Sequence, residues 1–309
     1  MRHKWKAKAG LFLAVTFVAA GALGAAQPAT GIPDEVIQLT QFGPALGVAA
    51  VALLWPGGVR ALLAGALPGR RPGRAAGSPP YGSGPVPAPY GSGPVPAPYG
   101  SGPVPAPYGS GPVPAPYDPA HAPYGAGRAL PLLATALLIT ALSAGAYALA
   151  TGDAHATDPR ALDHPFALIV VAQLVGACGE EIGWRCFFQP LLRTRFGPLA
   201  ASAAVGVVWG VWHVQVFAQA PAYAAGFLLA TVAMSVVLGL GLERVRANRL
   251  LLAGGFHTLI NLGMLLFMDE ESGAVLPMVL FGAACLVAAV PWVRRAPAAT
   301  IPAVAPSGR

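Results

Sequence analysis

Three groups of polar side chains lie inside apolar stretches of this 309-residue sequence. A charge at the centre of a membrane helix costs about 2.5 to 3.5 kcal/mol, so such groups indicate a function or a tight partner. The groups are, in chain order, Glu180, Glu181 and Arg185; Trp209 and His213; and His257 and Asn261. Together they supply carboxylates, imidazoles and an amide, which can act as a general base toward water and as hydrogen-bond donors to a developing oxyanion.

The spacing of the first group separates the roles of the two glutamates. Glu181 and Arg185 are four residues apart, so on a helix they lie one above the other and neutralise each other. Glu180 is then left without a partner, about 100 degrees around the helix from Glu181. A desolvated carboxylate beside a like charge can accept a proton from water near neutral pH. We therefore predict that Glu180 is the general base.

The third group offers two hydrogen-bond donors to one site. His257 and Asn261 are also four residues apart, so their side chains project from the same helix face. Two adjacent donors suit a developing oxyanion. His213 adds an imidazole from another helix, which can orient the same water or bind a metal.

Composition indicates what carries these groups. Hydrophobic residues make up 55% of the chain and charged residues 10%, whereas a soluble domain carries about 25% charged residues. Apolar stretches of membrane-crossing length predict an all-α fold, a polytopic membrane helix bundle of about eight transmembrane helices. The predicted spans are 11–26, 42–56, 129–150, 166–186, 199–219, 222–242, 250–268 and 274–293.

The charges between the spans predict the topology. Lys and Arg clusters fall on one face at every second crossing and most Asp and Glu on the other, so both termini are predicted to be cytoplasmic in the plasma membrane. The basic excess is explained by topology, and no nucleic-acid partner is expected. The first span has an alternative interpretation as a cleavable signal peptide. At ~1.5 Å per residue, Glu180, His257 and Asn261 lie in the cytoplasmic half, whereas His213 is ~22 Å deep and requires a tilted or late-starting helix. We expect substrate to arrive from the cytoplasm.

Four parts are predicted along the chain. Residues 1–60 form an N-terminal helix pair, 61–127 a disordered cytoplasmic Pro/Gly-rich linker, 128–295 the main helix bundle, and 296–309 a tail. The linker holds four copies of Tyr-Gly-Ser-Gly-Pro-Val-Pro-Ala-Pro over 81–116, which favours an extended spacer over a ligand for a proline-binding module.

The three motifs resemble a known family, the intramembrane proteases that include the type II CAAX prenyl endopeptidases and the bacterial abortive-infection and bacteriocin-processing proteins. Their pattern is Glu-Glu-x-x-x-Arg, then aromatic-x-x-x-His, then His-x-x-x-Asn/Asp on successive helices, and it matches over roughly 166–268. Trp209 stands where the family usually has Phe.

The resemblance implies an intramembrane peptidase, a hydrolase. Glu180 and His213 would hold the nucleophilic water, and His257 with Asn261 would stabilise the oxyanion. The implied roles of Glu181 and Arg185 are structural or substrate-binding, and we place Trp209 with them. The expected partners are a peptide or membrane-protein substrate and the lipid bilayer.

No cofactor is expected, because zinc would occupy the carboxylate that acts as the base and no His-Glu-x-x-His helix is present. If a metal is bound, its ligands would be Glu180, His213 and His257, and zinc is the candidate. One competing function is a catalytically silent membrane immunity or scaffold protein that binds a peptide partner in the same cavity. Another is a permease with a proton relay.

Overall fold

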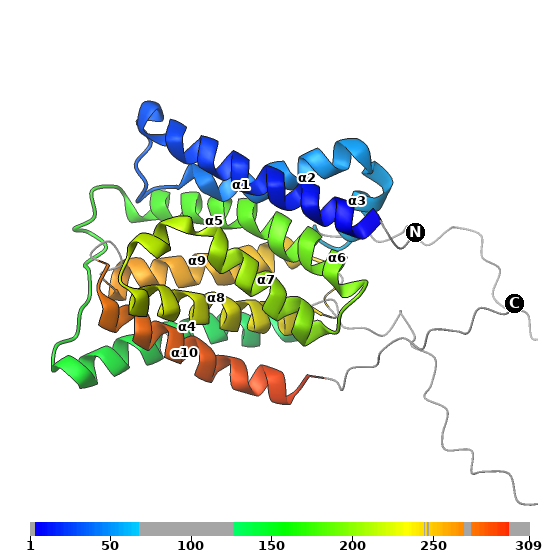
Figure 1. Ribbon diagram of the computed structural model, residues 1–309. Helices are drawn as coiled ribbons and strands as arrows, with labels where there is room; N and C mark the ends of the chain where they lie inside the picture. Colours follow the sequence, from blue (N-terminus) through cyan, green and yellow to red (C-terminus); the bar gives the residue numbers. More distant parts are fainter. Residues whose placement is uncertain (1–3, 68–125, 244, 246, 269–272, 297–309) are drawn as a thin grey trace, which may run out of the picture. The chain divides into compact units, whose positions relative to one another are not determined.

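The computed structural model describes residues 4–67, 126–243, 245, 247–268 and 273–296, and all regular structure in these ranges is helical (Figure 1). The order of elements is α1 (Lys4–Thr30), η1 (Leu39–Phe42), α2 (Gly43–Leu54), α3 (Pro56–Leu62), α4 (Ala126–Thr151), α5 (Phe166–Gly183), η3 (Trp184–Phe188), α6 (Gln189–Arg193), α7 (Pro198–Trp212), η4 (Val214–Ala218), α8 (Pro221–Leu242), α9 (Arg249–Phe267) and α10 (Val275–Arg294).

Each of the eight predicted spans overlaps one of the longer helices, namely α1, α2, α4, α5, α7, α8, α9 and α10. Six helices are long and apolar enough to cross a membrane, and two further apolar segments, 39–54 and 198–212, are shorter. The predicted fold class, a polytopic all-α membrane bundle, is therefore confirmed.

The helices that carry the polar motifs lie inside the bundle. α1 packs on α2, α5 packs on both α2 and α9, and α4 packs on α9 and α10. α8 packs on α10 and α7. Figure 1 shows α1 and α2 along one side and α4 and α10 along the opposite side, with α5, α7 and α9 between them.

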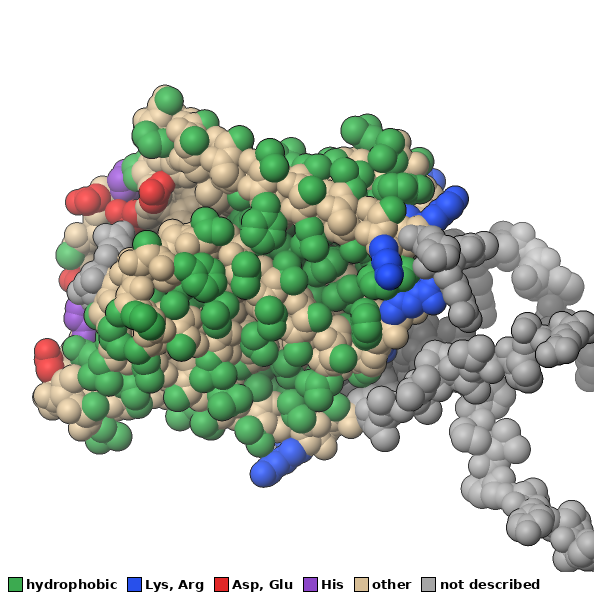
Figure 2. All heavy atoms as spheres, viewed as in Figure 1, with side chains coloured by type: hydrophobic (Ala, Val, Ile, Leu, Met, Phe, Trp, Pro, Cys, Tyr) green, Lys and Arg blue, Asp and Glu red, His purple; other side chains and the backbone are tan. Residues whose placement is uncertain are grey.

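Charged side chains separate to the two ends of the bundle. Lys and Arg gather at the end where α1 begins and α10 ends, and Asp and Glu gather mostly at the opposite end (Figure 2). This separation is the one that the charge pattern predicts for helices that alternate in direction. The orientation of the bundle in a membrane stays a prediction.

Small residues let α5 approach its neighbours. Gly176, Gly179 and Gly183 face residues 41–44, and a Cβ added at any of the three would collide with Gln41, Phe42 or Pro44. Small residues at helix contacts allow the close packing on which membrane bundles depend. The last turns of α5, which carry the two glutamates, are thereby fixed against η1 and α2.

The contact between α7 and α8 is equally close. A Cβ at Gly206 or Gly210 would meet the backbone or side chain of Thr231, and Ser235 Oγ donates to the carbonyl of Ser202 at 2.7 Å. These contacts fix the helix that carries Trp209.

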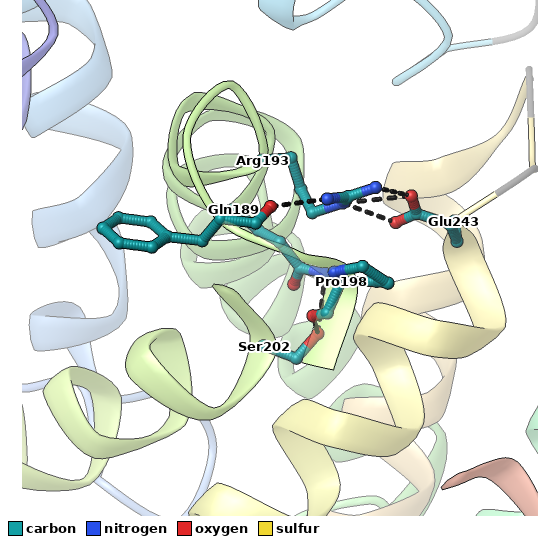
Figure 3. A network of polar contacts seen from close by, with 6 residues as sticks. Gln189, Arg193, Pro198, Ser202 and Glu243 are labelled. Carbon is teal, nitrogen blue, oxygen red and sulfur yellow. Dashed lines mark hydrogen bonds and ion pairs between the residues drawn. The ribbon is translucent and has the colours of Figure 1, made fainter. Parts of the chain in front are cut away.

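A polar network holds the turn between α6 and α7 to the end of α8 (Figure 3). Arg193 Nε donates to both carboxylate oxygens of Glu243 at 3.0 Å. Gln189 Nε2 donates to Ser202 Oγ at 3.3 Å, and that hydroxyl donates to the Pro198 carbonyl at 2.7 Å. α6 is therefore tied both to the N-terminal part of α7 and to the end of α8.

An aromatic cluster joins α1 to the continuation of α5. Phe12 is buried, and its ring lies 5.5 Å from Trp184, 5.1 Å from Phe187 and 5.3 Å from Phe188. These three partners belong to η3, a π-helical turn. Such turns occur mostly as single insertions in α-helices, and often at functional sites.

The beginning of the predicted linker is folded. Arg249, the first residue of α9, donates from Nη2 to the carbonyls of Leu62 and Ala64 at 3.0 and 2.6 Å. The rest of the predicted linker from residue 68 to 125, with its repeats, lies outside the described residues, as does the tail from residue 297 on.

Candidate active site

Three helices and the turns that follow two of them supply the predicted site residues. Glu180 and Glu181 lie near the end of α5, and Arg185 lies in η3. Trp209 is on α7, His213 directly follows α7, and His257 and Asn261 are on α9.

Glu180 is almost completely buried and has one described hydrogen-bond partner. The residue is 1% exposed, and its Oε2 accepts a hydrogen bond from Trp209 Nε1 at 2.8 Å. Within the described part of the chain no partner of Oε1 is found, and Glu180 lines a cavity. One oxygen is thus held by α7 while the other is free to accept a proton.

Glu181 bridges two helices. Its Oε1 lies 3.0 Å from His257 Nδ1 and its Oε2 lies 3.3 Å from Arg185 Nε. The predicted pairing of Glu181 with Arg185 is present, and the side chains of both are fully buried. Because a carboxylate accepts, His257 Nδ1 is the donor, and Nε2 is the ring nitrogen left for the cavity. Sequence reasoning missed this contact between α5 and α9.

Arg185 is held by charge and by an aromatic face. Its guanidinium carbon lies 4.8 Å from the centroid of the Trp209 ring. None of its three guanidinium nitrogens has a hydrogen-bond partner among the described residues. The stability of this buried cation therefore depends on the Glu181 carboxylate and on the Trp209 ring.

His213 is not on a helix, contrary to the prediction of a span over 199–219. α7 ends at Trp212, and His213 caps it with non-helical backbone angles. Its Nδ1 lies 2.9 Å from the carbonyl of Trp209, and since a carbonyl accepts, Nδ1 carries the proton. α7 begins at Pro198, so the alternative of a late-starting helix is wrong.

Asn261 belongs to a chain of amides that the sequence did not reveal. Its Nδ2 donates to Gln173 Oε1 at 2.9 Å, and Gln173 Nε2 reaches the carbonyl of Glu35 at 3.4 Å. Gln173 lies seven residues before Glu180 on α5, two turns along the same face. That spacing was a usable signal.

The predicted residues surround one cavity of about 710 Å³. Its wall includes Glu180, Trp209, His213, His257 and Asn261. Glu181 and Arg185 are not in the wall, and they lie directly behind His257 and Trp209.

The cavity leads to the acid-rich end of the bundle. Its other lining residues include Asp34 and Glu35 after α1, and His155 and Asp163 between α4 and α5. Under the predicted orientation this is the external end, which does not agree with the expected arrival of substrate from the cytoplasm, and both the orientation and the direction of access stay predictions. Loops form the opening of the cavity. Counting apolar spans locates helices only, so it could not show at which end the cavity opens.

A second, more apolar cavity of about 690 Å³ adjoins the first. It lies between α1 and the segment after α7, and it shares Asp34, Gln38, His213 and Gln215 with the first cavity.

The residues named for zinc do not form a metal-binding group. In the described ranges no three His, Cys, Asp or Glu side chains are placed to hold a metal ion. The Trp209 indole contacts both imidazoles, with ring centroids 5.2 Å from His257 and 6.0 Å from His213, and it donates to Glu180. An indole N–H on the carboxylate competes with a metal for the same oxygen.

Comparison with known proteins finds matches over the part of the chain that holds the site. Residues 162–263 match the family model described as type II CAAX prenyl endopeptidase Rce1-like. All seven predicted site residues, from Glu180 to Asn261, fall within this range. The resemblance inferred from the motifs is confirmed.

Curated relatives match over similar lengths. CAAX prenyl protease 2 of Methanococcus maripaludis is 28% identical over 128 residues, which are 38% of this chain and 47% of the relative. Lysostaphin resistance protein A of Staphylococcus aureus is 24% identical over 132 residues, 43% of this chain and 31% of the relative. The matches thus span less than half the length of these relatives.

Proposed function

We propose that this chain is an intramembrane endopeptidase in which Glu180 activates water to cleave a peptide or membrane-protein substrate. The observation that carries the proposal is the position of Glu180, a buried carboxylate that lines the same cavity as His213, His257 and Asn261. The match of residues 162–263 to a prenyl endopeptidase family model supports the same reaction class.

Glu180 is suited to act as the base. Trp209 fixes one carboxylate oxygen, so the other can take a proton from a water in the cavity. The water oxygen attacks the carbonyl carbon of the scissile amide. The proton held by Glu180 then passes to the amide nitrogen as the C–N bond breaks, which yields a carboxylic acid and an amine. His213 presents Nε2 to the same cavity and can accept a second hydrogen bond from the water.

His257 and Asn261 are suited to stabilise the oxyanion. Asn261 gives one N–H to Gln173 and retains a second. His257 donates from Nδ1 to Glu181, so it can also donate from Nε2 when the ring is protonated. Glu181 contacts both His257 and Arg185, so Glu181 and Arg185 are positioning residues for His257.

The test is a comparison of membrane-protein N-termini from cells that carry the wild-type chain or Glu180→Gln. The amide keeps an oxygen for Trp209 but cannot accept a proton, so we expect the new N-termini made by the wild type to disappear at equal protein abundance. Glu243→Gln is the matched control, because Glu243 lies at the other end of the bundle beside Arg193. Identical N-termini in wild type and Glu180→Gln would refute the proposal.

A second candidate is a catalytically silent protein that binds a peptide in the same cavity. The observation in its favour is the match to Lysostaphin resistance protein A, whose name states a resistance phenotype and no reaction. This candidate predicts that Glu180→Gln leaves the cellular phenotype unchanged. Replacement of other residues that line the cavity should abolish that phenotype.

A further inference from the structure

The carboxamide of Asn261, which lines the cavity, has two possible orientations. Half a turn about the last bond of the side chain exchanges the NH2 group, which donates hydrogen bonds, with the oxygen, which accepts them. An oxyanion requires a donor, so only one orientation serves the proposed reaction. Whatever fixes this orientation therefore contributes to the rate of that reaction.

A backbone carbonyl determines the orientation of Asn261 through Gln173. The carbonyl oxygen of Glu35 can only accept, so the Gln173 amide turns its NH2 group toward it, at 3.4 Å. The other polar atom of that amide is an oxygen, which accepts from Asn261 Nδ2 at 2.9 Å. The contact with Glu35 is longer than the usual 2.7 to 3.2 Å, but a reversed Gln173 would set two oxygens against each other there. In the same way, a reversed Asn261 would set its oxygen against that of Gln173.

The Glu35 carbonyl is held in place by a buried glutamine of α1. Gln27 is 5% exposed, and its Nε2 donates to the carbonyl of Ile37 at 2.8 Å and to that of Ile32 at 3.3 Å. Its Oε1 accepts from the backbone N–H of Leu39 at 2.7 Å. One side chain therefore holds the loop that contains Glu35 on both sides of that residue.

We propose that Gln27, the Glu35 backbone carbonyl and Gln173 form a relay that holds Asn261 as a hydrogen-bond donor to the cavity. Gln27 and Gln173 are then positioning residues, because both act through Asn261. This inference rests on the proposed function, in which that donor stabilises the oxyanion. It also extends the site beyond residues 162–263, the range that matches the family model, to α1 and the loop that follows it.

The hydrogen bond of Asn261 can be observed without a substrate. Asn248 is the only other asparagine in the sequence, so the full-length chain labelled with 15N-asparagine gives few side-chain NH2 signals in a 1H–15N spectrum in detergent micelles. Asn261→Ala identifies the signals of Asn261. We expect one proton of this NH2 group to be shifted downfield and to exchange slowly with solvent, because Gln173 accepts from it. Gln173→Met removes the acceptor and nearly preserves the volume, so that proton should move upfield and exchange faster.

Three further variants locate the effect. Gln173→Glu retains an acceptor for Asn261 and should keep the downfield proton, whereas Gln27→Met releases the loop and should lose part of the shift. Gln189→Met is the matched control, because Gln189 is also a buried glutamine that donates to another side chain, but it belongs to the network of Figure 3. An unchanged Asn261 signal in Gln173→Met, or an equal change in Gln189→Met, would overturn the relay. An unchanged signal in Gln27→Met would overturn the part that is assigned to α1.

Cleavage kinetics test the contribution to catalysis. The substrate is a labelled peptide that spans a cleavage site found by comparing the wild-type chain with Glu180→Gln. One neutral hydrogen bond corresponds to about a two- to tenfold effect, so Gln173→Met should lower kcat by about that factor at unchanged KM, because the oxyanion forms only in the transition state. In the Asn261→Ala chain the same substitution should change kcat by less than about twofold, since the residue through which it acts is gone. Equal losses in both chains, or an effect on KM alone, would overturn the inference.

The spectra and the kinetics separate this inference from the proposed function. If Gln173→Met shifts the Asn261 signal but no cleavage depends on Glu180, the relay is supported and the protease is refuted. If cleavage depends on Glu180 but Gln173→Met changes neither the signal nor kcat, the protease is supported and the relay is refuted.

Discussion

Replacement of Glu181 by Gln tests the ion pair behind the active site. The side chains of Glu181 and Arg185 are both fully buried, and the guanidinium nitrogens of Arg185 have no hydrogen-bond partner in the described ranges. Removing the partner of a buried charge costs about 3 to 5 kcal/mol, because the remaining ion is left desolvated. The amide of Gln also turns an N–H toward the guanidinium or toward His257, which are both donors.

This cost is large compared with the stability of a typical protein, about 5 to 15 kcal/mol. For a chain of this size about 1 kcal/mol shifts the midpoint of thermal unfolding by 2 to 4 °C, so Glu181→Gln is expected to lower it by about 6 to 20 °C. Glu180→Gln is the control in the adjacent residue. Trp209 can still donate to its amide oxygen, so the midpoint should change by no more than about 3 °C.

The assay is thermal unfolding in detergent with a dye that becomes fluorescent on reaction with thiols, because Cys186 and Cys285 are buried in the native bundle. Addition of Arg185→Met to Glu181→Gln removes the unpaired charge and should restore most of the lost stability. Activity should stay low in that double variant, since His257 then lacks its carboxylate. A wild-type midpoint for Glu181→Gln, or no recovery with Arg185→Met, would refute the reasoning.

Three further predictions test the oxyanion site, the topology and the linker. Asn261→Ala removes one oxyanion donor and should lower the cleavage rate by about 100 to 1000-fold at unchanged abundance, and a wild-type rate would exclude this role. A reporter fused within 81–117 should be cytoplasmic and one fused after Asp269 external, whereas two reporters on the same side would show that the number of spans between them is wrong. Deletion of two of the four repeats in 81–116 should leave abundance and activity unchanged, because changing the length of a flexible loop costs only fractions of a kcal/mol; a large loss would favour a partner that binds the prolines.

The helices were predictable because a membrane allows few alternatives. Only helices satisfy the backbone of a single apolar segment in lipid, so each apolar stretch became a helix. The predicted helix end at residue 219 was wrong, because α7 ends at Trp212. The apolar residues continue past Trp212, but the backbone turns there, and hydropathy does not distinguish an apolar helix from an apolar turn.

The sequence predicted residues that lie around one cavity, but it predicted only some of the contacts among them. Spacing on one helix correctly paired Glu181 with Arg185. It could not show that Glu181 also contacts His257, because that contact depends on how α5 and α9 pack. Gln173 was missed, although it lies seven residues before Glu180 on the same face of α5.

The end of the bundle toward which the cavity extends was not predictable from depth along the helices. Counting residues places a side chain along a helix axis, but it does not show where the space between helices is left unfilled. That space is determined by the loops around residues 34 and 163, which border the cavity. Those loops contain acidic residues from which only the topology was predicted.

The contacts of the site also hold the bundle together. Glu180 joins α5 to α7 through Trp209, Glu181 joins α5 to α9 through His257, and Gln173 joins α5 to α9 through Asn261. Apolar side chains gain little from association in lipid, so interhelical polar contacts carry a larger share of the specificity of packing. Each polar contact that positions a reactive group in this bundle is therefore also a tie between helices. Loss of packing and loss of activity should accompany each other where a substitution leaves a buried charge unpaired, as Glu181→Gln does, and they should separate where it preserves the hydrogen bond, as Glu180→Gln does.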